Sequence, residues 1–159
     1  MRWPGGVPIL ALDMYEHAYH LDFGAAAGAY VDAFMANIDW AQVYERYQGA
    51  VHGASELFGA DQDELADAEV LDVRRVGMFE KAEALIPGAS WRDPASVDAW
   101  AGDVPRDKQI VVYCVYGHEV GRATALRLRA RGVEARFLRG GIDGWQAAGR
   151  RVEPKAKSS

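Results

Sequence analysis

Apolar and polar positions follow one pattern in the first third of the chain and another in the rest. Residues 7–12 (VPILAL) predict a short strand, and residues 25–36 carry apolar side chains at the spacing of a helix. Asp39 predicts the N-cap of a second helix that runs through Tyr47. Residues 49–59 are small and Gly-rich, which predicts a linker. Residues 1–60 are therefore expected to form a mostly helical N-terminal extension.

From residue 65 onward, short apolar segments alternate with amphipathic ones. Strands are predicted at residues 70–73, 109–113 and 134–138, and the middle one (QIVVY) is apolar throughout, as in a buried parallel sheet. Helices are predicted at residues 94–101 (capped by Asp93), 120–131 and 142–148, with a short helix or turn at 79–85. This alternation predicts an α/β domain over residues 61–150, a small parallel sheet with helices on both faces. Residues 151–159 are expected to be a frayed tail.

Composition narrows the class of protein. The chain has 159 residues, 50% hydrophobic and 26% charged, which is typical of a globular domain and excludes a disordered chain. A single cysteine excludes an intramolecular disulfide. No apolar run approaches the roughly 20 residues of a membrane span, and the apolar run near the N-terminus reaches Asp13 too soon for a secretory signal. We therefore expect a soluble, cytoplasmic protein with no membrane partner.

Charge is unevenly distributed. Residues 1–69 carry 2 basic and 12 acidic side chains, whereas residues 70–159 carry 16 basic and 11 acidic ones, within a net charge of −5. The basic part has no dense stripe of Lys and Arg, so we expect no nucleic-acid partner. Its six arginines between 122 and 139 favour a small anionic substrate instead.

The strongest chemical feature is Cys114, which follows the apolar strand directly and precedes a loop and a helix (IVVY-C-VYGHEVG-R). Ligands of open α/β sheets bind at the carboxyl ends of the strands, where Cys114 is expected to lie. Loop N–H groups and the positive end of the next helix would stabilise a thiolate and hold an anion. A buried structural cysteine at a strand end is the alternative interpretation.

Four motifs in order carry a family resemblance: DVR (72–74), IPGA (86–89), VVYC–x–x–G (111–117) and LRGGIDGW (138–145). Together they resemble a rhodanese domain over residues 65–149. The resemblance implies a sulfurtransferase that takes sulfane sulfur from an anionic donor such as thiosulfate. The sulfur would be held as a persulfide on Cys114 and passed to a thiophilic acceptor, cyanide or a thiol. No metal or organic cofactor is implied.

The resemblance also assigns roles around Cys114, with Asp72 and Arg74 expected to be structural. Cys114 would be the catalytic nucleophile, and Arg122 would attract the donor, although a solvated helix face is an alternative for that arginine. The substrate-binding residues would be Val115, Tyr116, Gly117, His118, Glu119, Val120 and Arg122.

Three positions of this loop depart from related proteins. His118 and Glu119 stand where many rhodaneses carry basic or hydroxyl residues, so Glu119 would weaken thiosulfate activity if it pointed inward, whereas His118 could hydrogen-bond the persulfide. Val120 stands where related phosphatases place an arginine, which disfavours phosphatase activity. The alternative from another class is a module that senses or binds oxidants or toxic oxyanions through Cys114 without turnover, in a stress response.

A second resemblance covers residues 3–48. Asp13 and His17, four residues apart, could converge on iron or manganese. The surrounding sequence (PILALDMYEHAYHLDFG…AYVDAFMANIDW) resembles the C-terminal end of an iron/manganese superoxide dismutase, with Tyr15 in place of a tryptophan. That resemblance makes Asp13 and His17 two of four ligands, and the helices that supply the other two are absent from this sequence. We therefore expect no bound metal, and a segment used for packing or for a homodimer.

Overall fold

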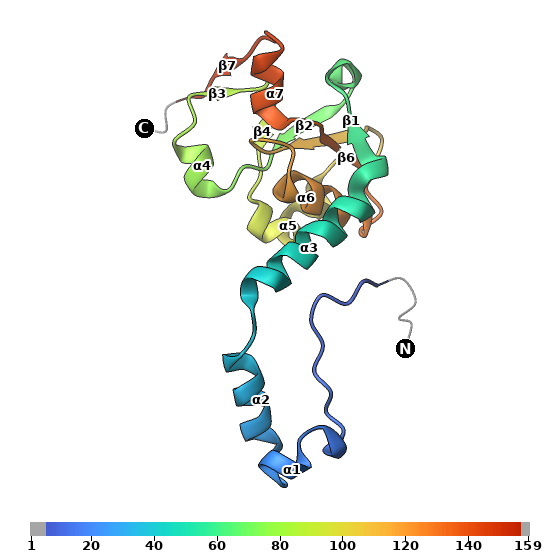
Figure 1. Ribbon diagram of the computed structural model, residues 1–159. Helices are drawn as coiled ribbons and strands as arrows, with labels where there is room; N and C mark the ends of the chain where they lie inside the picture. The colour runs from blue at the N-terminus through green and yellow to red at the C-terminus, as the bar shows by residue number, and fades with distance from the viewer. Residues whose placement is uncertain (1–5, 157–159) are drawn as a thin grey trace. The chain divides into compact units, whose positions relative to one another are not determined.

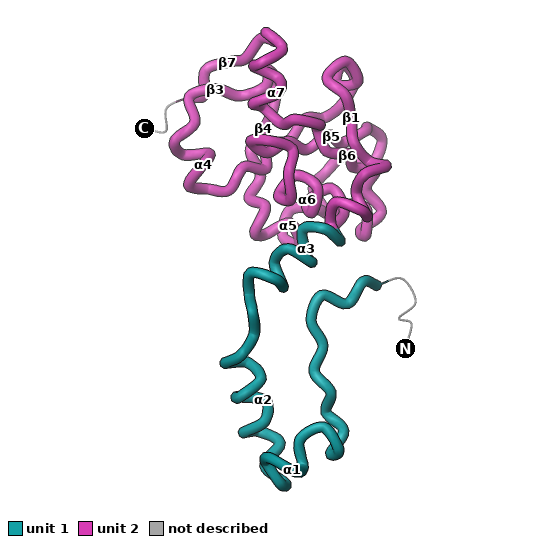
Figure 2. Tube along the Cα trace, in the orientation of Figure 1, with its two compact units in different colours: residues 1–50 teal, residues 51–159 magenta. Residues whose placement is uncertain are grey.

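The computed structural model describes residues 6–156 and divides into two compact units, residues 1–50 and 51–159 (Figures 1 and 2). The boundary falls inside α3 (Trp40–Ser55), ahead of the division predicted after residue 60. The predicted linker at residues 49–59 is wrong, because α3 continues to Ser55 and is followed by a 3-10 turn, Glu56–Phe58. Val51 and Ser55 are buried, and this packing outweighs the cost of about 1 kcal/mol for each glycine within the helix.

The first unit is helical, as expected. It contains a 3-10 turn at Glu16–Ala18, α1 (His20–Phe23), α2 (Ala27–Ala36) and most of α3. Asp39 caps α3 as predicted, since its Oδ1 accepts hydrogen bonds from the N–H groups of Ala41 and Gln42 at 3.1 and 3.2 Å.

The strand predicted at residues 7–12 is wrong. Those residues have no regular structure, because no described strand pairs with them and Pro8 lacks an N–H donor. Tyr19, stacked on Tyr30 with 4.9 Å between ring centroids, is the one buried side chain among residues 6–50. This unit therefore has little core of its own.

The second unit contains the predicted parallel sheet (Figure 1). It has five strands in the order β1-β6-β5-β2-β4. The strands are β1 (Gly59–Ala60), β2 (Glu69–Asp72), β4 (Ser90–Trp91), β5 (Ile110–Tyr113) and β6 (Ala135–Leu138). The three predicted strands correspond to β2, β5 and β6, whereas the two-residue edge strands were not predicted. Because all neighbours are parallel, their carboxyl ends lie at one edge of the sheet.

Both faces of the sheet are covered, as predicted. Along β5, Ile110 and Val112 belong to one apolar cluster and Val111 and Tyr113 to the other, the alternation expected of a strand buried on both sides. The helices are α4 (Val76–Glu80), α5 (Val97–Trp100), α6 (Glu119–Arg129) and α7 (Gly141–Ala147). The predicted helix at 94–101 is divided into a 3-10 turn, Pro94–Ser96, and α5; Asp93 caps the turn through a 2.9 Å hydrogen bond from Ala95 N–H.

The C-terminal segment is ordered where a frayed tail was predicted. β7 (Glu153–Pro154) pairs with β3 (Ala84–Leu85) in a small antiparallel sheet. The ammonium of Lys155 donates to the carbonyl oxygens of Phe79 and Glu80 at 2.6 and 3.0 Å. The prediction is therefore wrong for residues 153–155, while residues 157–159 lie outside the described part of the chain.

No helix among residues 6–156 has the length and apolar character needed to cross a membrane.

We propose that residues 6–50 form the interface of a homodimer, because this unit exposes many large apolar side chains. They are Val7, Leu10, Met14, Tyr15, Leu21, Met35, Trp40, Tyr44 and Tyr47. Leu21→Asp, at a side chain 96% exposed, should weaken self-association at least tenfold, measured by analytical ultracentrifugation. Leu57→Asp, at an 89% exposed leucine of the second unit, is the matched control and should not change it. A wild-type chain that stays monomeric at high micromolar concentration would contradict the proposal.

Candidate active site

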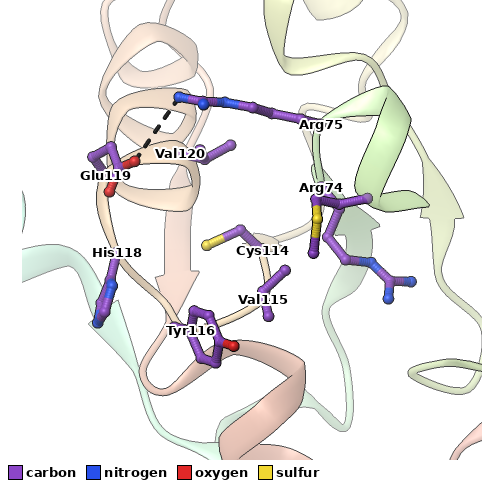
Figure 3. Close-up of a pocket in the computed structure, with 9 residues that line it drawn as sticks. Arg74, Arg75, Cys114, Val115, Tyr116, His118, Glu119 and Val120 are labelled. Carbon is purple, nitrogen blue, oxygen red and sulfur yellow. Dashed lines mark ion pairs between the residues drawn. The ribbon is translucent and has the colours of Figure 1, made fainter. Parts of the chain in front are cut away.

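Cys114 follows β5 at the carboxyl edge of the sheet and faces a cavity of about 210 Å³. Its side chain is 5% exposed. Figure 3 shows the sulfur directed into the space between Tyr116 and the first turn of α6. The cavity is lined by Arg74, Arg75, Met78, Cys114, Val115, Tyr116, His118, Glu119 and Val120.

The first turn of α6 packs directly against the sulfur. A Cβ built on Gly121 would lie 3.4 Å from Cys114 Sγ and 3.6 Å from Cys114 N, so the glycine lets the helix backbone approach this closely. The positive end of the helix therefore lies beside the cysteine sulfur, where an anion would be bound favourably.

The loop after Cys114 is held from outside by the start of α7. Ile142 N–H donates to the Cys114 carbonyl and Asp143 N–H to the Val115 carbonyl, each at 3.0 Å. Gly117 has a φ of +70°, and a Cβ there would lie 2.7 Å from the backbone nitrogen of Gly140. Two carbonyl oxygens of the loop are thus turned toward α7, which contributes no residue to the lining of the cavity.

The residues predicted to bind substrate do not all reach the cavity. Val115, Tyr116, Glu119 and Val120 line it, as expected. His118 also belongs to the lining, but Figure 3 shows its imidazole directed away from the sulfur. Gly117 contributes the turn rather than a cavity wall.

Arg122 does not line the cavity and has other partners, whereas the expected role as a substrate guide would place it beside the donor. Its Nη1 donates to Ser55 Oγ at 3.1 Å and to the Glu56 carboxylate at 2.9 Å, and its Nε donates to the Gly117 carbonyl at 3.2 Å. Its guanidinium also lies 4.2 Å from the centroid of the Phe137 ring. Arg122 therefore supports the loop from behind.

Glu119 does face the cavity, and its charge is partly compensated. Arg75 Nη2 lies 3.9 Å from Glu119 Oε1, the pair drawn as a dashed line in Figure 3. Sequence reasoning did not single out Arg75. The available signal was its position directly after the DVR motif, which places it at the same sheet edge as Cys114 because β2 pairs with β5.

Asp72, Arg74 and Tyr113 form a buried polar network beneath the cavity. Arg74 Nε donates to both carboxylate oxygens of Asp72 at 3.0 and 2.9 Å, and the Tyr113 hydroxyl donates to Asp72 Oδ2 at 3.1 Å. Burial would lower the pKa of Arg74, but the hydrogen bonds and charge of Asp72 raise it above its ordinary value. Burial, and then the Asp72 charge, raise the pKa of Tyr113. Asp72 is fully buried, whereas Arg74 also lines the cavity, and the structural role expected for both stays a prediction.

The two candidate metal ligands of the first unit contact each other. His17 Nε2 lies 3.4 Å from Asp13 Oδ2, and both side chains are exposed. Within residues 6–156, no cluster of three or more His, Cys, Asp or Glu side chains has the geometry to hold a metal ion.

Gly141→Ala should damage the site through the backbone. Gly141 has a φ of +59°, and its Cβ would lie 2.5 Å from the Cys114 carbonyl oxygen and still closer to that of Val115. We expect a loss of about 2 kcal/mol in the free energy of unfolding and reduced alkylation of Cys114 by iodoacetamide. Gly149→Ala is the matched control, since its φ is +71° but nothing lies within 4 Å of the added carbon. It should cost only about 1 kcal/mol and leave Cys114 unchanged. Equal effects of the two substitutions would contradict this account.

Glu56 should make folding of the second unit pH-dependent. Hydrogen bonds from Arg139 and then Arg122 lower the pKa of Glu56 from 4.5 to about 2. A carboxyl group with a depressed pKa stabilises the folded state above its unfolded pKa and loses that contribution as the pH falls through the folded value. Glu56→Gln should therefore melt below wild type at pH 7, and the difference should shrink between pH 4.5 and pH 2 in thermal denaturation. Glu80→Gln, at an exposed glutamate of α4, is the control, and a constant difference for Glu56→Gln would refute the linkage.

Known proteins resemble the two units separately. The family model of iron/manganese superoxide dismutases, C-terminal domain, matches residues 1–46. An iron superoxide dismutase of Cupriavidus metallidurans is 64% identical over 47 residues, which are 30% of this chain and 24% of that protein. A manganese superoxide dismutase of Haloarcula marismortui is 47% identical over 47 residues, 30% of this chain and 23% of that protein. The chain thus spans about a quarter of these curated relatives.

Solved structures resemble the second unit. A rhodanese-related protein from Thermoplasma volcanium has a TM-score of 0.54 at 22% identity, covering 60% of this chain and 96% of that one. A protein from Lactobacillus plantarum has a TM-score of 0.53 at 26% identity, covering 62% and 89%. The rhodanese-like domain model matches residues 55–148, more than half of the chain. The chain therefore belongs to the rhodanese-like family, which is of the sulfurtransferase type, and carries ahead of that domain a segment similar to the end of a superoxide dismutase.

Proposed function

We propose that the chain is a sulfurtransferase that moves sulfane sulfur from an anionic donor such as thiosulfate to a thiophilic acceptor through a persulfide on Cys114. The observation that carries the proposal is the position of Cys114 Sγ, inside a cavity and 3.4 Å from the Cβ position of Gly121 in the first turn of α6. A helix of eleven residues has its N-terminal turn beside the group that must bear negative charge.

The reaction proceeds in two displacements on sulfur. The Cys114 thiolate attacks the outer sulfur of thiosulfate, the S–S bond of the donor breaks, and its electron pair leaves with sulfite. Cyanide or a thiolate then attacks the outer sulfur of the persulfide and expels the Cys114 thiolate. Neither displacement needs a general base when the attacking group is an anion. The helix terminus supports this chemistry by stabilising both the thiolate and the persulfide.

Intact-protein mass spectrometry after treatment with thiosulfate and then cyanide tests the proposal. Wild type should gain the mass of one sulfur atom, and cyanide should remove it with release of thiocyanate. Cys114→Ser should show neither change, and the assignment is unambiguous because the chain has a single cysteine.

An absence of added sulfur, with Cys114 still open to alkylation, would contradict turnover with thiosulfate. The alternative, a sensing module that binds or is oxidised at Cys114 without turnover, would then be favoured.

A further inference from the structure

A second cavity of about 210 Å³ adjoins the one that holds Cys114. The two share Arg74, Met78 and Val115 in their linings, so they are neighbours, and we call the two together the groove. The far cavity is lined by Arg74, Met78, Lys81, Ala82, Val115, Ile142, Asp143 and Gln146. Together the two cavities offer more volume than a cyanide ion fills, which favours a larger acceptor.

The part of the groove near Cys114 has little unpaired charge with which to distinguish one acceptor from another. Arg74 is engaged by the buried Asp72, and Arg75 is paired with Glu119. Each cation that lines this cavity is therefore offset by a carboxylate. Unpaired charges that could select among small thiols are therefore sought in the other cavity.

Besides Arg74, which is engaged by Asp72, the far cavity carries one group of each charge. Lys81, at the end of α4, and Asp143, in the first turn of α7, are both exposed, and neither is ion-paired with another residue of the described chain. Gln146 adds an amide that both donates and accepts hydrogen bonds. The apolar part of the wall is formed by Met78 and Val115, which line both cavities, and by Ile142 of the far cavity; Arg74 also lines both.

We propose that this groove selects a short zwitterionic thiol, of amino-acid or dipeptide type, as the sulfur acceptor. The carboxylate of the acceptor pairs with Lys81 and its ammonium with Asp143, while its aliphatic part lies along Met78 and Val115. The inference rests on the proposed function, because it names the acceptor for the persulfide on Cys114.

The transfer balances without a further reactant. The acceptor thiolate attacks the outer sulfur of the Cys114 persulfide and forms a new S–S bond. The bond between that sulfur and Cys114 Sγ breaks, and its electron pair returns to Cys114 as a thiolate. The products are a hydropersulfide of the acceptor and the free enzyme.

The test begins from protein loaded with sulfur from thiosulfate and freed of excess donor. Discharge of the persulfide is followed by intact mass with three acceptors: cysteinylglycine, the uncharged N-acetyl-cysteinylglycine amide, and cyanide. Each acceptor is compared between wild type, Lys81→Ala, Asp143→Ala and Lys108→Ala. Because each acceptor is compared only between variants, differences in intrinsic reactivity between the acceptors do not affect the result. Lys108 is the matched control because it is an exposed lysine that lines neither cavity.

Lys81→Ala and Asp143→Ala should each raise the half-saturating concentration of cysteinylglycine about fivefold, as expected of exposed ion pairs, with the maximal rate unchanged. Neither substitution should alter discharge by the uncharged amide or by cyanide, and Lys108→Ala should change nothing. Equal effects on the charged and uncharged peptides, or none on either, would overturn this inference and leave the proposed function standing. Failure of thiosulfate to load Cys114 would instead overturn the proposed function.

Discussion

The site depends on a close approach of two backbone segments, the loop after Cys114 and the start of α7. A Cβ on Gly141 would collide with the carbonyl oxygens of Cys114 and Val115. The N–H groups of Ile142 and Asp143 donate hydrogen bonds to the same two carbonyls. A loop that must present its interior to an anion cannot leave its carbonyl oxygens pointing inward. The pair of glycines at residues 140–141 solves this problem by giving those oxygens partners on the outer side.

Arg122, Arg136 and Arg139 stabilise the fold around the site. A basic stretch beside a reactive cysteine suggests substrate attraction, yet Arg122 and Arg139 both bind Glu56, and Arg136 binds Glu64. These ion pairs fasten the acidic segment before β2 to β6 and to the Cys114 loop. Part of the acidic excess before residue 70 is thus neutralised by arginines of the second unit. In the groove, the arginines near the sulfur are paired with carboxylates, and one lysine lies in the far cavity.

The sequence alone predicted the parallel sheet and the position of Cys114, because both depend on local patterns. The apolar run of β5 and the glycines that end α6 and α7 are visible without knowledge of the partners. The two-residue strands β1 and β4 were missed because pairing, rather than propensity, makes them strands. The partners of Arg122 lie 66 and 67 residues away, so no local spacing could show that it faces Ser55 and Glu56. The Gly-rich segment before residue 56 is helical because tertiary burial of Val51 and Ser55 overrides composition.

The first unit shows what a hydrophobic pattern cannot predict. Its sequence matches a superoxide dismutase closely, and α2 and α3 form where the pattern predicts helices, yet Tyr19 is its one buried side chain among residues 6–50. A hydrophobic pattern predicts which face of a helix or strand is buried, but it does not predict which other residues cover that face. The spacing of Asp13 and His17 illustrates the same point. Two side chains four residues apart converge whether or not further ligands exist, and with no third donor nearby in the described chain they form an exposed pair with each other. The spacing of two metal ligands can therefore occur without the further ligands that metal affinity requires.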